Sequence, residues 1–417
     1  MLRLLIACAL LGTGLISAPA VRADEPPGAR LAPLLALARA QNPRLAAARL
    51  ASDAALARAQ QADSLADPTF KLEFEGLERR TGPLPATAGE RTYFLEQHVP
   101  LGPKLRLRRE IAEGEQQAAS AAQAGVNDDL ASRIKSLQAE RFLAHESLRL
   151  RGALAALLRQ VHAVAIQAYE QGRGGQDAVL ATELRIDRNE TAMLRLGGMR
   201  RQQDARLNSL LDRLPGSPLA DPAGLSSMPE ADRLSPATLL ATASRLNAEA
   251  GRLRALENSA VARRRLADAE WLPDIAFGVG VVERGGAVSA YEATVSINLP
   301  LRWGLRQARQ RETASALAAR EAERRAVERE IAGEITETLA AIASERRVEA
   351  LLEGASLPRA RAMSRNALSA YRQGLGGLAP AVEAELKRVD LEIELLAVRV
   401  EQRRLLARIE RLIGEDL

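Results

Sequence analysis

Two hydrophobic periods divide the chain into helical and strand-forming stretches. Over residues 31–66 apolar side chains recur about every 3.6 positions, which predicts helix with a turn or a restart at Asn42-Pro43. Asp67-Pro68 is predicted to end that helix, because the residue before a proline is driven out of the helical region. Apolar and charged residues then alternate from Phe70 to Glu75, which indicates a half-buried strand.

The remainder of the first half follows from the same two periods. A loop rich in Gly and Pro at 76–90 precedes a second strand at 92–99, so residues 69–99 are predicted to form a β-hairpin. Helix is then expected over 104–168 and over 176–214, with Gly152 as a candidate interruption. At about 1.5 Å per residue the first of these helices is about 95 Å long, far longer than a globular domain requires.

The same order returns after a Pro-rich linker at 215–236. Strands are expected at 275–281 and 291–299 around a short loop at 283–289, which gives a second β-hairpin at 274–299. A long helix is expected over 305–370 with a bend near Pro358, which lacks a backbone donor. In the last helix, apolar residues spaced by 3 and 4 predict packing side by side with neighbouring helices. They are Leu386, Val389, Ile393, Leu396 and Val400.

A glycine-containing motif occurs twice, at Tyr169–Leu184 and at Tyr371–Leu386, 202 residues apart. Because glycine accepts positive φ, each copy predicts the tip of a long helical hairpin. Near-constant offsets between matching features indicate an internal duplication. The expected organisation is a first repeat at 24–214 with its tip at 169–177, a linker at 215–236, and a second repeat at 237–417 with its tip at 371–383.

Composition supports long helices rather than an aromatic core. Apolar residues make up 47% of the 417 residues, but aromatic residues only 3%. The net charge of +5 comes from arginine interspersed with glutamate, which indicates solvated helix faces. No basic block with interleaved aromatic residues occurs, so no nucleic-acid partner is expected.

Residues 1–23 have the features of a secretory signal peptide: Arg3, an apolar run at 4–16 and a small-residue cleavage site ending at Ala20 or Ala23. The single cysteine, Cys8, lies inside this segment, and the apolar run continues past it, which favours ordinary cleavage over lipid attachment. The mature chain is therefore expected to lack disulfides and thiolate metal sites. No later stretch reaches about 18 apolar residues, so no transmembrane helix is expected.

The number of predicted strands limits how this chain could cross a membrane. In lipid every backbone amide must be paired, so a spanning sheet has to close into a barrel. Four strands are too few, since single-chain barrels use about eight or more. The hairpins therefore either form a small soluble sheet or contribute to a barrel shared by several copies. The apolar, alternating strands of an exported chain favour the shared barrel.

The whole order of elements resembles the TolC-type outer-membrane efflux proteins. The resemblance rests on Tyr169-x-x-Gly172 with Val179-Leu180, Tyr371-x-x-Gly374 with Val382, Leu357-Pro358 and the junction Gln97–Lys104. The Gly102-x-Lys104 form of that junction is more similar to the CzcC-like heavy-metal branch. The fold expected from the periods and the resemblance together is mainly α, with long helical hairpins and two β-hairpins per chain.

The family resemblance implies an outer-membrane channel that works by passive export from the periplasm. It implies a homotrimer with a 12-stranded β-barrel in outer-membrane lipid and a helical tunnel in the periplasm. It also implies a periplasmic adaptor and an inner-membrane pump, of the RND type, as partners. Heavy-metal cations are the cargo that the branch suggests. The alternative is a periplasmic coiled-coil adaptor or scaffold without a pore, although adaptors usually carry one helical hairpin.

The resemblance also suggests roles for residues at the tips. Glu383 matches the second of two acids that ring the tunnel entrance, whereas Pro380 stands in place of the first; the alternative is a first-turn acid that favours the helix N-terminus. Asp177 is expected to be a plain helix cap. Tyr169 and Tyr371 either hold the gate shut or pack as ordinary coiled-coil residues. The turn glycines are expected to contact the adaptor: Gly172, Gly174, Gly175, Gly374, Gly376 and Gly377.

Aromatic residues of the strands are candidates for lipid contact or an aromatic girdle, with a soluble sheet core as the alternative. They are Phe70, Phe74, Tyr93, Phe94, Phe277 and Tyr291. The histidines His98, His145 and His162 share no ligand spacing, so no metal site or cofactor is expected. No Gly-x-Ser-x-Gly, phosphate loop or His-Glu-x-x-His motif occurs, and no enzyme activity is expected.

Overall fold

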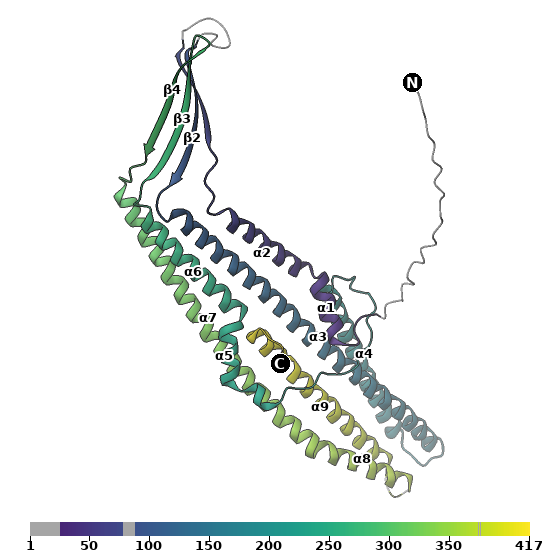
Figure 1. Cartoon of the computed structure of the whole chain (residues 1–417). Coiled ribbons are helices and arrows are strands. Elements are labelled where there is room, and N and C mark those ends of the chain that lie inside the picture. Colours follow the sequence, from purple (N-terminus) through teal and green to yellow (C-terminus); the bar gives the residue numbers. More distant parts are fainter. Residues whose placement is uncertain (1–25, 78–87, 374, 376) are drawn as a thin grey trace, which may run out of the picture.

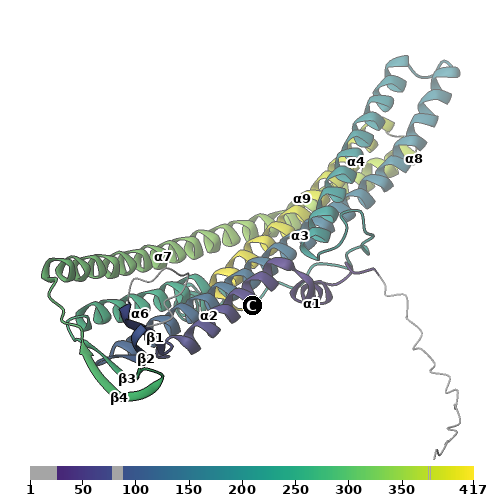
Figure 2. The ribbon, with the colours of Figure 1, turned by 90° about the horizontal axis from the view of Figure 1, so that it is seen from above.

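The computed structural model describes residues 26–77, 88–373, 375 and 377–417. The predicted signal peptide at 1–23 with Cys8, most of the loop at 76–90, and Gly374 and Gly376 of the second tip lie outside the described residues. Long helices form an elongated bundle, and a small antiparallel sheet projects from one end of it (Figures 1 and 2). The predicted fold class, mainly α with a minor β portion, is confirmed.

The first half begins with two short helices, α1 (Leu31–Gln41) and α2 (Pro43–Gln61). Asn42 separates them as predicted, and its side chain accepts hydrogen bonds from the backbone N–H groups of the first turn of α2. The prediction that this helix continues to Ala66 is wrong. The chain leaves the helix at Gln61 because polar contacts replace helical ones: Asp63 pairs with Arg109 at 3.2 Å, and the Ala66 carbonyl accepts from Gln97.

The first long hairpin consists of α3 (Lys104–Glu170) and α4 (Gln176–Leu210). The predicted interruption at Gly152 is absent, since α3 runs through it for 67 residues. One glycine costs a helix about 1 kcal/mol. The buried side chains of Leu154 and Leu158, two and six residues later, supply packing that offsets this cost.

The second half has the same order of elements, but its long ascending helix is divided into three pieces. A 3-10 turn, η1 (Ala231–Leu234), leads into α5 (Pro236–Leu246) and α6 (Ala248–Ala269). The second hairpin consists of α7 (Trp303–Leu351), a π turn η2 (Leu352–Ser356), α8 (Leu357–Arg372) and α9 (Leu378–Ile413).

The bend predicted near Pro358 corresponds to the π turn η2, which ends two residues before Pro358. Pro358 has no N–H to donate, and its ring would clash with the carbonyl four residues earlier in a regular helix. The wider π turn relieves that clash.

Four strands form one antiparallel sheet in the order β1 (Thr69–Leu77), β2 (Ala88–Pro100), β3 (Asp274–Arg284) and β4 (Ala287–Ile297). The two hairpins join through β2 and β3, so the two halves of the chain share one sheet. The prediction of a loop over 283–289 is wrong, because the connection in the structure is shorter. Gly285 and Gly286 alone form the turn, both with positive φ, and the strands extend on either side of them.

Small side chains explain how the bundle packs with so few aromatic residues. Helix α3 lies against α4, α6 and α9. Where it crosses α6, a Cβ atom on Gly114 would lie 2.9 Å from Ser259 and 3.0 Å from the Ala255 carbonyl, so only glycine fits. The predicted seam of α9 is confirmed, since Val389 and Val400 are buried and Leu386 and Ile393 pack in the same cluster as Val389.

Candidate functional sites: the sheet faces and the helical tips

The sheet carries its large apolar side chains on one face. The register aligns Leu72 with Tyr93, Tyr93 with Val281 and Val281 with Tyr291, so these side chains point to the same side. Phe277 is 50% exposed and Tyr291 is 82% exposed. The sheet projects beyond the helices (Figure 1), and the helices leave this face uncovered. Its other exposed members are Phe70, Phe74, Leu95, Val279, Val295 and Ile297.

The opposite face of the sheet is polar, with one aromatic exception. Phe94 was expected among the lipid-contacting residues, but it lies on this opposite face and is only 8% exposed. Successive residues of a strand point to opposite sides, so Tyr93 and Phe94 cannot share a face. The Phe94 ring covers Gly278 and Gly280, where an added Cβ atom would overlap the ring at 2.2 to 2.5 Å. Charged groups share this polar face, including the Lys71–Glu96 ion pair at 2.6 Å.

The two helical tips lie together at the end of the bundle opposite the sheet (Figures 1 and 2). At the first tip Gly172 has a φ of +63° and the Arg173 N–H donates to the Ala168 carbonyl at 2.8 Å. At the second tip the Leu375 N–H donates to the Ala370 carbonyl at 2.9 Å. Both helices therefore end with the same bond spanning five residues, which is the Schellman arrangement.

The remaining tip glycines have distinct positions. Gly175 and Gly377 are the N-cap residues of α4 and α9, both in extended conformation. A Cβ atom on Gly174 would lie 3.2 Å from the Ala168 Cβ, so the turn is tight there. Tyr169 and Tyr371 occupy the last turn before each tip, and Tyr169 is half exposed.

Two expectations about tip acids need correction. Asp177 is not the helix cap, because Gly175 occupies that position and Asp177 is an exposed residue of the first turn. Glu383 is the sixth residue of α9, so it lies beyond the first turn and the helix-terminus explanation does not apply to it. Instead its carboxylate accepts two hydrogen bonds from Arg185 of α4, at 2.9 Å from Nε and 2.6 Å from Nη2.

The Arg185–Glu383 ion pair joins the two helical hairpins near their tips. Glu383 remains 60% exposed at its side chain, whereas Arg185 is mostly covered. Two turns further along α9, Asp390 pairs with Arg151 of α3 at 2.8 Å. Arg188 and Lys387 line the same groove between α4 and α9, which makes it predominantly basic. Sequence reasoning found Glu383 but missed Arg185, because arginines occur throughout these helices without a distinguishing pattern.

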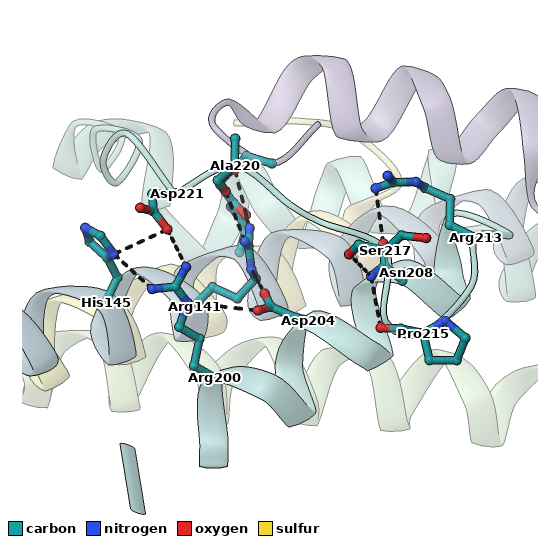
Figure 3. Close-up of polar contacts among 12 residues, drawn as sticks. Arg141, His145, Arg200, Asp204, Asn208, Arg213, Pro215, Ser217, Ala220 and Asp221 are labelled. Carbon is teal, nitrogen blue, oxygen red and sulfur yellow. Dashed lines mark hydrogen bonds and ion pairs between the residues drawn. The ribbon is translucent and has the colours of Figure 1, made fainter. Parts of the chain in front are cut away.

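A buried polar cluster halfway along the bundle was also missed (Figure 3). Arg141 of α3 is 1% exposed and donates to Asp204 of α4 at 2.6 Å and to the Ala220 carbonyl at 3.0 Å. Nearby, Arg200 binds Asp221. These bonds hold Ala220 and Asp221, within the linker predicted at 215–236, against α3 and α4.

The junction motif at Gly102-x-Lys104, which suggested the heavy-metal branch, has a structural role. The Lys104 ammonium group is buried and donates to the Leu272 carbonyl at 2.8 Å and to Asp274 at 2.7 Å. Gly102 adopts a φ of +75° beside the Leu272 side chain. The motif therefore ties the start of α3 to the start of β3 in the other half of the chain.

At the second hairpin an acid and a base have pKa values below their ordinary ones. A hydrogen bond from Arg388 lowers the pKa of Glu385 below its ordinary value, and the Ser364 hydroxyl of α8 donates to the same carboxylate at 2.6 Å. Burial lowers the pKa of Arg403 in α9. Within the described ranges no cluster of three or more His, Cys, Asp and Glu side chains is arranged to hold a metal ion. The helices that the structure describes include none long and apolar enough to cross a membrane.

Comparisons with known proteins identify the fold. No protein-family model matches the chain, and no curated protein matches it. Solved structures do: the outer membrane protein VceC from Vibrio cholerae aligns with a TM-score of 0.77 and 17% identity, over 93% of this chain and 96% of that chain. The open state of the Neisseria gonorrhoeae MtrE outer membrane channel aligns with a TM-score of 0.76 and 17% identity, over 93% and 89%.

A third structure, the Campylobacter jejuni CmeC outer membrane channel, aligns with a TM-score of 0.75 and 13% identity, over 92% of this chain and 85% of that chain. Agreement extends across both hairpins and the sheet, since each alignment covers nearly the whole chain. The chain therefore has the fold of these outer-membrane channel proteins.

Proposed function

We propose that this protein is the outer-membrane channel of a tripartite efflux system and exports its cargo passively from the periplasm. The observation that carries the proposal is the uncovered apolar face of the sheet, on a chain with the fold of outer-membrane channels. A soluble sheet would bury such a face against helices. A periplasmic scaffold without a pore is not favoured, because it has no use for this face.

Three copies complete the barrel in this proposal. The sheet has four strands with β1 and β4 at its edges, and an open edge in lipid would leave backbone groups unpaired. Pairing β4 of one copy with β1 of the next closes a ring, and three copies give twelve strands. The apolar face then meets lipid, and the polar face with Lys71 and Glu96 lines the lumen.

The helical tips form the periplasmic entrance in this proposal. Glu383 is exposed near the second tip, and three copies in a narrow tube would focus negative potential there. Arg185 partly neutralises Glu383 and links the two hairpins, so the pair belongs to the closed state. Asp177, Tyr169 and Tyr371 lie within the same end of the bundle and complete the proposed gate.

The turn glycines are the proposed contact for a periplasmic adaptor, which connects the channel to an inner-membrane pump. The tips are the surface farthest from the sheet, so they face the pump when the sheet spans the outer membrane (Figure 1). An RND-type pump and heavy-metal cargo stay predictions of the family resemblance.

The two halves, at 24–214 and 237–417, are proposed to derive from a duplication. Asn42 and Asn247 both cap the helix that follows them, and each Nδ2 donates to a carbonyl at the end of the returning helix, Leu210 and Leu412 respectively. The matched Schellman bonds at the tips support the same relation.

Single-channel conductance of the purified protein in planar bilayers tests this function. We expect infrequent openings from the native protein and more frequent ones when the Arg185–Glu383 link is removed. Absence of conductance from both proteins, together with a water-soluble monomer after removal of the signal peptide, would overturn the proposal.

A further inference from the structure

Besides the basic groove near the tips, another groove lies between the helices about halfway along α3. It has a volume of about 570 Å³, which is within the usual range for small-molecule sites. Leu143 of α3, Met199 and Gln203 of α4, Glu345 of α7 and Glu401 of α9 are among its lining residues. We call it the acidic groove.

The walls of the acidic groove are largely apolar. Leu143, Leu196 and Met199 contribute large side chains to it, and Met199 is 49% exposed. A thioether side chain is flexible and polarizable, so Met199 can adapt to ligands of different outline. The groove therefore offers contact to an apolar body rather than to a small hydrated ion.

Acids outnumber bases in the acidic groove. Glu140, Glu345 and Glu401 line it, and Arg404 is the one basic residue among the lining residues that the structure describes. Arg404 pairs with Glu140 at 3.1 Å and with Glu401 at 2.7 Å, and Glu345 takes part in neither pair. One guanidinium cannot neutralise three carboxylates, so the groove carries a net negative charge.

A buried hydrogen-bond acceptor also lines the acidic groove. Gln203 is 7% exposed, and its Oε1 atom is buried without a hydrogen-bond partner among the described residues. A buried acceptor without a donor is costly and rare in folded proteins, so it indicates a missing partner. The partner must bring an N–H or O–H group, and the negative charge of the groove favours an N–H group on a cation.

The acidic groove lies on the side of α3 that faces away from the connection between the two halves. Arg141 and His145 of α3 contact Ala220 and Asp221 of that connection (Figure 3). Leu143 is two residues from each of them, a little more than half a turn, so it points to the opposite side of α3. Helix α1 packs on the same side of α3 as the connection. Three copies of these segments inside a tunnel would obstruct it, so in the proposed trimer the acidic groove faces the lumen.

We propose that the acidic groove binds an organic cation that combines an apolar body with an N–H donor, and that it does so in the wall of the export tunnel. The N–H group donates to Gln203, the positive charge is balanced by Glu345, and the apolar body lies against Leu143 and Met199. The place in the tunnel rests on the proposed function, whereas the binding itself does not.

Fluorescence anisotropy of proflavine, a flat aromatic cation with amino N–H groups, measures this binding to the purified full-length mature protein in a non-ionic detergent. Gln203→Leu removes the acceptor and Glu345→Gln removes the charge, and we expect each to weaken binding at least about fivefold. Glu337→Gln is the matched control and should leave binding unchanged, because Glu337 is an exposed acid of α7 outside the groove. Circular dichroism checks that each variant is folded. Equal binding by the native protein and both groove variants would overturn the proposal.

Displacement of proflavine tests the chemistry of the ligand. We expect 4-phenylbutylammonium to displace it at a concentration at least about fivefold lower than its trimethylammonium analogue, which has the same charge and apolar body but no N–H group. The anion 4-phenylbutyrate should not displace it. Equal potency of the two cations would overturn the role of Gln203. Stronger displacement by Zn²⁺ than by 4-phenylbutylammonium would also overturn the proposal, because the groove would then be a site for inorganic cations.

Planar bilayers test the place of the acidic groove in the tunnel. We expect 4-phenylbutylammonium to reduce the single-channel current of the native protein, and Glu345→Gln to require at least about fivefold more of it for the same reduction. Equal reduction of both currents would overturn the placement in the tunnel wall. If no variant conducts, the proposed channel fails and the placement fails with it, whereas the binding measured by anisotropy stands or falls by itself.

Discussion

At the residue scale, one ion pair connects the two hairpins next to the proposed entrance. Arg185 and Glu383 come from helices of different halves and are joined by two hydrogen bonds. Because Glu383 is largely exposed, each pair contributes only about 0.5–1 kcal/mol to the closed arrangement. Three copies acting together would still shift an opening equilibrium by more than the contribution of any single pair.

We therefore expect Arg185→Ala to raise the open probability in planar bilayers at least about tenfold, since three lost pairs sum to about 1.5–3 kcal/mol. Arg188→Ala is the matched control, because Arg188 lines the same groove in the same helix. Equal effects of the two variants would show that groove charge, rather than the link to Glu383, controls opening.

A second residue-scale prediction concerns pH. Arg388 holds the pKa of Glu385 below the value it has in the unfolded chain, so the Glu385 contacts stabilise the fold above that unfolded value. This contribution is lost as the pH falls through the lowered pKa. Ser364 and Glu385 connect α8 to α9, so hydrogen-exchange protection of this hairpin should fall on acidification.

Glu385→Gln should lower that protection at neutral pH by on the order of 1 kcal/mol and flatten its dependence on pH. Glu401→Gln is the control, because Glu401 has the same spacing to its arginine, Arg404, but lies in an exposed pair. A pH profile that survives Glu385→Gln would assign the dependence to another group.

At the element scale, one asparagine in each half performs the same task, Asn42 in the first and Asn247 in the second. Asn247 accepts from the Ala250 N–H at 2.8 Å and donates to the Leu412 carbonyl at 2.8 Å, and it is 6% exposed. It therefore caps α6 and fastens the end of α9. The sequence predicted a break at Asn42, but the partner that Asn247 finds 165 residues away could come only from the tertiary structure.

Asn247→Ala should destabilise the helical bundle by about 2–3 kcal/mol, because it removes the cap and leaves a buried carbonyl without its donor. Thermal unfolding followed by circular dichroism measures the loss. Asn247→Asp, which keeps the cap acceptor only, should fall between Asn247→Ala and the native protein. Asn366→Ala, at an exposed position in α8, should have little effect.

The two faces of β4 give a second element-scale prediction. Val295 and Thr294 are adjacent and both exposed, but they point to opposite faces of the sheet. If the apolar face meets lipid, Val295→Arg destabilises the sheet by about 1–2 kcal/mol, because the cost at the midplane falls toward the helical end of β4, whereas Thr294→Arg faces the lumen. The amount of folded protein recovered from outer membranes should fall only for Val295→Arg. Equal recovery of both variants would place the sheet in water.

At the scale of the whole molecule, the unpaired edges β1 and β4 predict how copies meet. Lys71 of β1 shares the polar face of the sheet with three residues of β4, Glu292, Thr294 and Ser296. A Lys71→Cys variant combined in turn with Glu292→Cys, Thr294→Cys or Ser296→Cys scans the unknown register between copies. Cys8 lies in the segment predicted to be removed, so the introduced thiols are the expected reactive ones.

We expect at least one of these pairs to form disulfide-linked dimers and trimers on mild oxidation, visible on a denaturing gel without reductant. Lys71→Cys alone should not form the trimer, because one thiol per chain can link only two chains. A scan that yields monomers throughout would contradict closure of the barrel between copies.

The sequence by itself determined which segments are helix and strand, because hydrophobic period and the positions of Gly, Pro and Asn act locally. It also located both tips and the apolar face of each strand. It misplaced features that depend on neighbours: α3 passes through Gly152 because of packing, and Phe94 turns to the polar face because strand geometry places it over two glycines.

Only the tertiary structure decided which distant residues meet. Periodicity assigns a residue to a face but does not name its partner, so the links from Arg185 to Glu383, from Lys104 to Asp274 and from Arg141 to Ala220 were invisible in the sequence. The same holds for the joining of β2 with β3 and for the exposure of residues 299–305 between β4 and the first turn of α7. These features depend on how two halves of one chain pack together, and that packing has no local signature.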